Sequence, residues 1–108
     1  MQLTSDADRL ICILYKAYLD SRDRGFSKAD ARCFGSSEKI HEAHFPDWLY
    51  EDVDETCREL SRNGLLNCFW ADGIAYSVEL SDSGICYMEN RFKNGIVGLT
   101  DFISKFIP

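Results

Sequence analysis

Apolar side chains recur at every third or fourth position between residues 47 and 63, which is the spacing of a helix with one buried face. This stripe consists of Leu49, Val53, Thr56, Cys57 and Leu60. Gly64 follows Arg62 and Asn63 and suits the left-handed position just beyond the last turn of a helix. The pattern therefore predicts an amphipathic helix that lies on a core and ends at Gly64.

Two runs rich in aromatic and branched residues follow this helix, at residues 66–70 and 74–80. Asp72 and Gly73 lie between them, and this pair favours the tight type I′ turn of a hairpin. We therefore expect a β-hairpin with Leu66, Cys68 and Trp70 on one side of the ribbon. On its other side, the facing pairs would be Ala71 with Ile74, Phe69 with Tyr76, and Asn67 with Val78.

Near the start of the chain, the apolar pattern predicts a helix over residues 6–21, opened by a capping box of Ser5 and Asp8. Its main stripe consists of Ala7, Leu10, Ile11, Leu14, Ala17 and Tyr18. The opposite side is also apolar and carries Cys12, Ile13, Tyr15 and Leu19. Because a surface helix has a polar outer face, we expect this helix to be covered on two sides.

Two short helices are expected in the middle of the chain. Ser27 is the cap of the first, over residues 28–34. Ser36 or Ser37 is the cap of the second, which ends near Phe45 because a residue that precedes proline is pushed out of helical geometry.

Two more helices are expected after the hairpin. Ser81 caps the first, and Asn94 with Gly95 closes it. Thr100 caps a last short helix, whose apolar residues are Phe102, Ile103, Phe106 and Ile107.

These elements together predict an α+β winged helix, a helical core with a two-stranded β-hairpin wing and C-terminal helices. A chain of 108 residues is one domain and can bury a core without disulfides or a metal. We divide it into a core of about residues 1–95 and a C-terminal helix tail, residues 96–108.

The charge weighs against the usual DNA-binding role of that fold. The chain has 18 acidic and 12 basic residues, a net charge of −6, which repels phosphate backbones at long range. Residues 47–63 carry six acids and two bases, and the first half is the acidic half. Direct reading of bases by this helix is disfavoured, and Arg58 and Arg62 would be its contributors to any nucleic-acid contact.

The remaining composition indicates a cytoplasmic chain with reduced thiols. No apolar run reaches the roughly 20 residues that a membrane span needs, and the first residues lack the pattern of a signal peptide. The five cysteines, at positions 12, 33, 57, 68 and 86, form no CxxC motif. We expect them to be small buried side chains rather than a disulfide framework or a metal site.

Other candidate chemistry is weak. His41 and His44 could share a helix face and bind a metal if Cys33 or a carboxylate such as Asp47 lay close to them, but an ordinary surface pair is favoured. A mixed-sign loop carries Arg22, Arg24, Lys28 and Arg32, and is either solvated surface or a nucleic-acid contact. Because the sequence has no nucleophile turn and no glycine-rich phosphate loop, we expect no enzymatic activity and no cofactor, and the sequence implies no small-molecule ligand.

Three segments resemble the YjcQ family of small bacterial and phage proteins. They are CRELSRNGLL at residues 57–66, ELSDSGICYME at residues 79–89 and DFISKF at residues 101–106. The resemblance implies a winged-helix domain, possible phage origin and no established biochemical function.

Two classes of function stay open. The first is a DNA-binding transcriptional regulator, by analogy with the fold. The second is a protein-interaction module without DNA binding, which the acidic helix and the apolar hairpin and tail favour. Trp70 either packs on the core or marks a protein contact. The tail residues Phe102, Ile103, Phe106 and Ile107 pack on the first helix of their own chain or across a homodimer, and we favour the homodimer.

Overall fold

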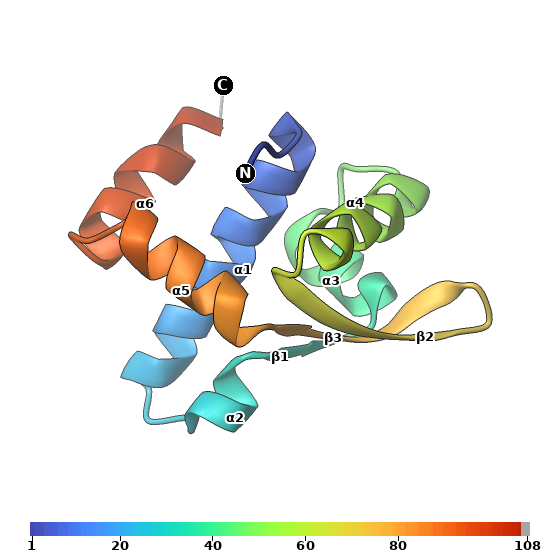
Figure 1. Ribbon diagram of the computed structural model, residues 1–108, viewed down its shortest axis with the longest axis horizontal. Helices are drawn as coiled ribbons and strands as arrows, with labels where there is room; N and C mark the ends of the chain where they lie inside the picture. Colours follow the sequence, from blue (N-terminus) through green and yellow to red (C-terminus); the bar gives the residue numbers. More distant parts are fainter. Residues whose placement is uncertain (107–108) are drawn as a thin grey trace.

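The computed structural model describes residues 1–106 and is an α+β structure with a three-stranded antiparallel sheet (Figure 1). Its elements are α1 (Ser5–Asp23), α2 (Lys28–Ala31), β1 (Cys33–Gly35), α3 (Ser37–His44), α4 (Tyr50–Arg62), β2 (Leu66–Ala71), β3 (Ile74–Leu80), α5 (Asp82–Arg91), α6 (Ile96–Ile103) and the short 3-10 helix η1 (Ser104–Phe106). Helix α1 runs through the middle, with α5 and α6 on one side and α3 and α4 on the other. The α+β class predicted from the sequence is confirmed.

Helix α1 is the centre of the core. Its fully buried side chains come from both stripes and include Leu10, Leu14 and Cys12, so the prediction of coverage on two sides is confirmed. The capping box was wrong by one position, because the Thr4 hydroxyl accepts the N–H of Ala7 and Ser5 is already helical. Within residues 1–106, no helix has both the length and the apolar character that crossing a bilayer requires.

Strand β1 was missed by the sequence interpretation. The helix predicted over residues 28–34 ends at Ala31, and Cys33 and Gly35 then pair with Glu79 and Val78 of β3. Its cap at Ser27 is confirmed, since the hydroxyl accepts the N–H of Asp30. A three-residue strand has no periodicity of its own, and its partner lies more than 40 positions away in the sequence.

The β2–β3 hairpin has the predicted tip but a different register. Asp72 and Gly73 both have positive φ, as the turn requires, and Ala71 pairs with Ile74 as expected. Beyond an irregularity in the ladder, Phe69 pairs with Ser77 instead of Tyr76, and Asn67 with Glu79 instead of Val78. Tyr76 is the extra residue of this bulge, so Tyr76 and Ser77 are both exposed.

The start of α5 is a tight junction against the end of α4. The Ser81 hydroxyl accepts the N–H of Gly84 at 2.9 Å, which confirms the predicted cap, and donates to the carbonyl of Gly64 at 2.6 Å. The backbone N–H of Ser81 donates to the carbonyl of Leu65 at 3.1 Å. A β-carbon added at Gly84 would lie 2.2 Å from that same carbonyl oxygen. Only glycine fits at this position.

The C-terminal tail covers α1 within its own chain. Leu99 and Ile103 of α6 are buried against the core, and the ring of Phe102 lies between those of Phe92 and Phe106. The predicted cap at Thr100 was wrong, because α6 begins four residues earlier, after Gly95. Ile107, the last of the four predicted tail residues, lies outside the described residues. A homodimer stays a prediction.

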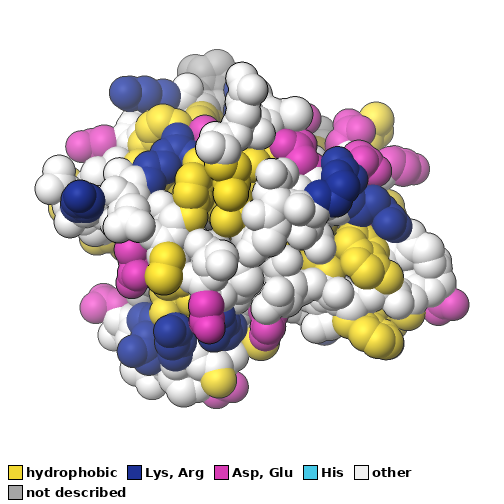
Figure 2. All heavy atoms as spheres, in the orientation of Figure 1, with side chains coloured by type: hydrophobic (Ala, Val, Ile, Leu, Met, Phe, Trp, Pro, Cys, Tyr) yellow, Lys and Arg dark blue, Asp and Glu magenta, His cyan; other side chains and the backbone are white. Residues whose placement is uncertain are grey.

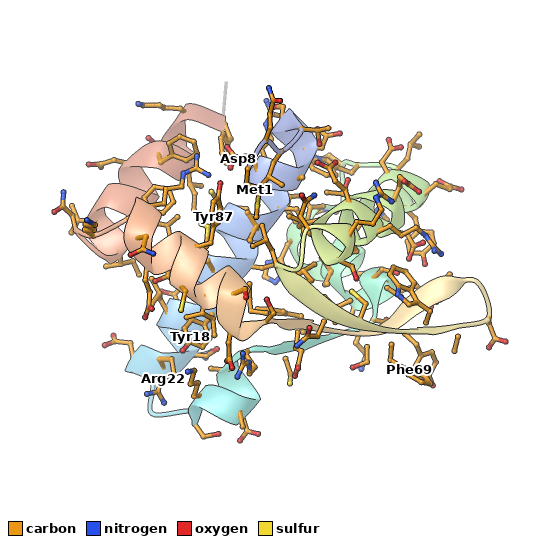
Figure 3. All side chains as sticks on the ribbon, viewed as in Figure 1. Met1, Asp8, Tyr18, Arg22, Phe69 and Tyr87 are labelled. Atoms are coloured by element: carbon orange, nitrogen blue, oxygen red, sulfur yellow. The ribbon has the colours of Figure 1, made fainter. Side chains whose placement is uncertain are left out.

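A pair of charges ties α5 to the start of α1. The guanidinium of Arg91 donates twice to the carboxylate of Asp8, and Arg91 also lies 4.5 Å from the ring centroid of Phe102. Figure 3 labels Asp8 on α1 and Tyr87 on α5, on the facing sides of the two helices. The arginine thus joins α1, α5 and the tail in one contact.

Candidate interaction surface

The exposed face of α4 is acidic in the folded chain. Glu51, Asp52 and Glu55 are exposed, and Asp6 of α1 lines a shallow groove of about 210 Å³ together with Asp52 and Glu55. The carboxylate of Glu59 is held by the N–H and the hydroxyl of Thr4, at 2.9 and 2.6 Å. At the upper right, Figure 2 shows acidic side chains next to a group of Lys and Arg side chains. An acidic face of this kind repels phosphates.

Asp54 is the exception on α4, because its side chain points into the structure. Its Oδ1 accepts from the hydroxyl of Ser37 at 2.8 Å and from the backbone N–H of Ala75 at 2.9 Å. The Ser37 hydroxyl also hydrogen-bonds to the hydroxyl of Tyr50 at 2.9 Å. Ser37 and Ala75 are fully buried, so Asp54 satisfies polar groups that water does not reach.

Arg58 fastens α4 to the tip of the hairpin. Its Nη2 donates to the carbonyl of Gly73 at 2.6 Å, and its Nε lies 3.4 Å from Oδ2 of Asp54. The guanidinium carbon lies 4.2 Å from the ring centroid of Trp70, a cation–π distance. The first candidate for nucleic-acid contact is therefore engaged by its own chain on three sides.

Arg62, the second candidate, is exposed and pairs loosely with a carboxylate. Its Nη1 lies 3.7 Å from Oε1 of Glu55, and both side chains are more than half exposed. A pair of this kind contributes little to stability and leaves the charge accessible. Arg62 is thus one accessible base next to the acids of α4.

The exposed aromatic residues of the hairpin are Phe69 and Tyr76, whose exposed fractions are 65% and 60%. Trp70, the sequence candidate for a protein contact, is half-buried and packs against the core and Arg58. Figure 3 shows Phe69 on the side of the sheet away from α4. We use the name outer sheet face for Asn67, Phe69, Ser77 and Glu79 on this side, together with the exposed bulge residue Tyr76 next to Ser77.

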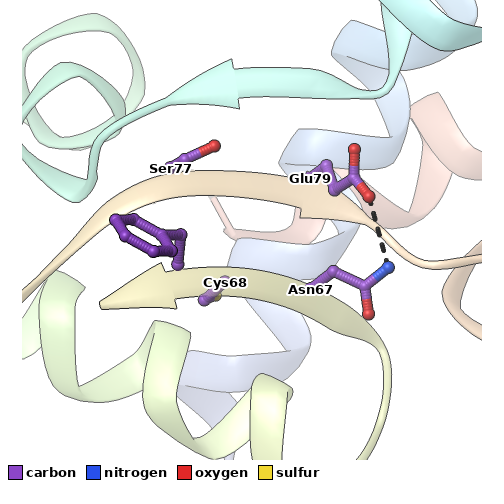
Figure 4. A pocket seen from close by; sticks show the side chains of 5 residues that line it. Asn67, Cys68, Ser77 and Glu79 are labelled. Atoms are coloured by element: carbon purple, nitrogen blue, oxygen red, sulfur yellow. Dashed lines mark hydrogen bonds between the residues drawn. The ribbon is translucent and has the colours of Figure 1, made fainter. Parts of the chain in front are cut away.

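The outer sheet face is shallowly hollowed and carries few charges. A depression of about 330 Å³ lies between β2 and β3, where Asn67 donates to the carboxylate of Glu79 at 3.3 Å (Figure 4). Strand β2 is at the edge of the sheet and contains no charged residue. An edge strand without charged residues can pair through its free backbone groups with a strand of another chain.

The basic side chains of the mixed-sign loop gather at the junction of α1 and α2, at the lower left of Figure 2. Several are engaged locally. Arg22 donates to the carbonyl of Phe26, Arg24 lies over the Phe26 ring, and Arg32 pairs with Asp82. Lys28 is exposed. Arg32 holds β1 beside the end of β3, because its Nε also donates to the carbonyl of Leu80.

The histidines are not brought together as metal ligands. Nε2 of His41 hydrogen-bonds to the carbonyl of Trp48 at 2.8 Å, which pins the connection between α3 and α4. Across residues 1–106, no cluster of histidine, cysteine or carboxylate side chains has the arrangement of a metal site. In the described part of the chain, His41 and His44 are therefore not accompanied by the further ligand that a metal site would need.

The five thiols fall into different environments. Burial raises the pKa of Cys12 and of Cys57 to about 12, and that of Cys68 to about 11. Cys33 and Cys86 are exposed, so the expectation that all five are buried was wrong. For Cys33, desolvation and the neighbouring carboxylate of Glu79 raise the pKa.

We expect a disulfide reagent at pH 8 to modify Cys86 first, Cys33 more slowly, and Cys12 and Cys57 only after unfolding. The reason is that the reagent attacks thiolates, and a buried thiol with a raised pKa stays protonated. Mass mapping of the labelled peptides over time checks this order. Fast labelling of Cys12 in the native protein would contradict the packing of α1.

Comparisons with protein-family models, with curated proteins and with solved structures give no match for this chain. The resemblance to the YjcQ family stays a prediction. The function therefore has to be inferred from the geometry and charge of the chain itself.

Proposed function

We propose that the chain is a winged-helix protein that acts as a protein-interaction module and not as a DNA-binding regulator. The order of α1, β1, α3, α4, β2 and β3 supports a winged helix, with α4 as the last core helix and the hairpin as the wing. The strand order β1-β3-β2 is consistent with this fold, because β1 pairs with β3 on the edge of the hairpin away from β2. This proposal includes the absence of enzymatic activity.

The choice between the two functions rests on the charge of the exposed face of α4 and on the contacts of Arg58. In a DNA-binding winged helix, this helix meets the bases and its cations meet the phosphates. Here the exposed side chains of its first turns are acids, and Arg58 is held by Gly73, Asp54 and Trp70. Freeing Arg58 for a phosphate would break the contact between α4 and the hairpin tip.

The outer sheet face is the surface we assign to a partner protein. Phe69 and Tyr76 are large and exposed, and aromatic side chains are enriched among the residues that anchor protein interfaces. The uncharged edge of β2 adds backbone groups that an extended segment of a partner can pair with. We infer a partner that presents an apolar pocket beside such a segment.

We expect the double substitution Phe69→Ser and Tyr76→Ser to weaken the partner complex by about 30-fold or more, because it removes both anchors. The measurement is quantitative mass spectrometry of proteins crosslinked to the chain in the cells that make it, followed by titration of the enriched protein. Val97→Ser is the matched control, since Val97 is 66% exposed but lies on α6, away from the sheet.

A protein that is recovered with the wild type and with Val97→Ser but lost with the double variant supports the proposal. If every recovered protein binds the double variant as tightly as the wild type, the outer sheet face is not the interface. Circular dichroism of all three proteins establishes that the fold is unchanged.

A further inference from the structure

A pocket of about 270 Å³ opens between α1, the connection from α3 to α4, and the C-terminal tail. Its walls are mainly apolar. The rings of Phe45 and Trp48 lie 4.5 Å apart on one side, and Ile103 and Phe106 approach from the tail. The pocket shares no lining residue with the outer sheet face.

One side chain in this pocket has an unmet polar group. The Nε–H of Arg9 is buried and has no hydrogen-bond partner within residues 1–106, while the guanidinium carbon lies 5.4 Å from the ring centroid of Phe106. The neighbouring carboxylate of Asp8 is occupied by Arg91. A buried donor without an acceptor costs free energy, and a molecule that brings an acceptor recovers that cost.

Arg9 is the source of positive charge among the residues that line the pocket. His44 also lines it, but desolvation lowers the pKa of its imidazole and so disfavours the charged form. Arginine recognises a carboxylate better than a neutral acceptor, because charge strengthens the hydrogen bond. The pocket thus joins aromatic walls to one cationic donor.

We propose that this pocket binds a small organic carboxylate with an apolar body, and that the guanidinium of Arg9 turns from the ring of Phe106 toward the pocket so that a carboxylate oxygen accepts its Nε–H. Ligand pockets span roughly 300 to 1,000 Å³, so this one takes a body of about one ring. The apolar body packs between Trp48 and Phe106. The inference goes beyond the proposed protein-interaction function and does not rest on it.

The test compares two probes of the same shape, 3-phenylpropanoate and its neutral amide 3-phenylpropanamide. The chain has two tryptophans, so the substitution Trp70→Phe leaves Trp48, which lines the pocket, as the single tryptophan. We expect a saturable change of Trp48 emission, with the carboxylate bound about tenfold more tightly than the amide because of the charge-assisted hydrogen bond. Equal affinities, or no change with the carboxylate, would overturn the proposal.

Two arginine substitutions test whether Arg9 supplies the positive charge that binds the carboxylate. Arg9→Met should reduce the affinity for the carboxylate to that for the amide, whereas Arg24→Met removes the same charge at the exposed α1–α2 junction and should change neither affinity. If Arg9→Met does not fold, the wild-type protein decides by NMR. The Nε–H resonance of Arg9 should move downfield with the carboxylate and not with the amide, and an unmoved resonance excludes the site.

Discussion

Replacing Gly84 by alanine should lower the free energy of unfolding by about 3 kcal/mol or more, as expected for severe overpacking at a rigid contact. The added β-carbon would meet the carbonyl oxygen of Leu65 at 2.2 Å, and this atom belongs to backbone that cannot rotate away. The same carbonyl accepts the N–H of Ser81, so moving it also strains the cap of α5. Chemical denaturation followed by circular dichroism measures the change.

Gly98→Ala is the matched control, because it makes the same chemical change inside another helix. At Gly98 the nearest atom to an added β-carbon is Cβ of Asn94 at 3.5 Å, an ordinary contact. Alanine is favoured over glycine in helices by about 1 kcal/mol, so this variant should be slightly more stable than the wild type. Equal effects of the two substitutions would contradict the close approach of α5 to Leu65.

Asp54→Ala should cost about 3 kcal/mol, since removing one member of a buried polar network leaves its partners unpaired. The substitution would strip the acceptor from the Ser37 hydroxyl and the Ala75 N–H and would leave Arg58 without its carboxylate. It would also loosen the bulge at Tyr76, which lies next to Ala75. Equilibrium unfolding measures the loss of stability, and amide exchange at Ala75 measures the loss of its hydrogen bond.

Two comparison variants separate the network from the charge of α4. Asp54→Asn keeps an oxygen that can accept from Ser37 and Ala75, so its cost should be smaller than that of alanine. Glu51→Ala removes an exposed acid from the same helix and should change stability by no more than about 0.5 kcal/mol. Similar losses for Asp54→Ala and Glu51→Ala would contradict the buried network.

Local signals in the sequence were sufficient for most helices. The caps at Ser27 and Ser81 were predicted because a hydroxyl that bonds the third residue ahead leaves a short-range pattern. The burial of α1 on both sides was predicted because two apolar stripes are visible in one helix. The turn at Asp72 and Gly73 follows from the need for positive φ at both positions.

Features that depend on distant contacts were missed. Strand β1 is defined by its pairing with β3, and the shift at Tyr76 lies beside the bond from Ala75 to Asp54, 21 positions away. The exposed aromatic residues of the hairpin also differ from those predicted, because contacts between distant elements decide which side chains are covered. Trp70 is covered by Arg58 of α4. Phe69 is exposed on the outer side of the sheet, and Tyr76 is exposed at the bulge. The Arg9 pocket combines three separate segments and leaves no sequence pattern.

The most direct measurement of the central claim is a titration of labelled duplex DNA with the protein, followed by fluorescence anisotropy in low salt and at about 150 mM salt. A pool of duplexes with randomised sequence allows any preferred site to be enriched first. Because the exposed face of α4 is acidic and Arg58 is held within the chain, we expect only weak, nonselective association that disappears at the higher salt. A nanomolar, sequence-selective complex that survives about 150 mM salt, and that Arg58→Ala with Arg62→Ala abolishes, would contradict the account.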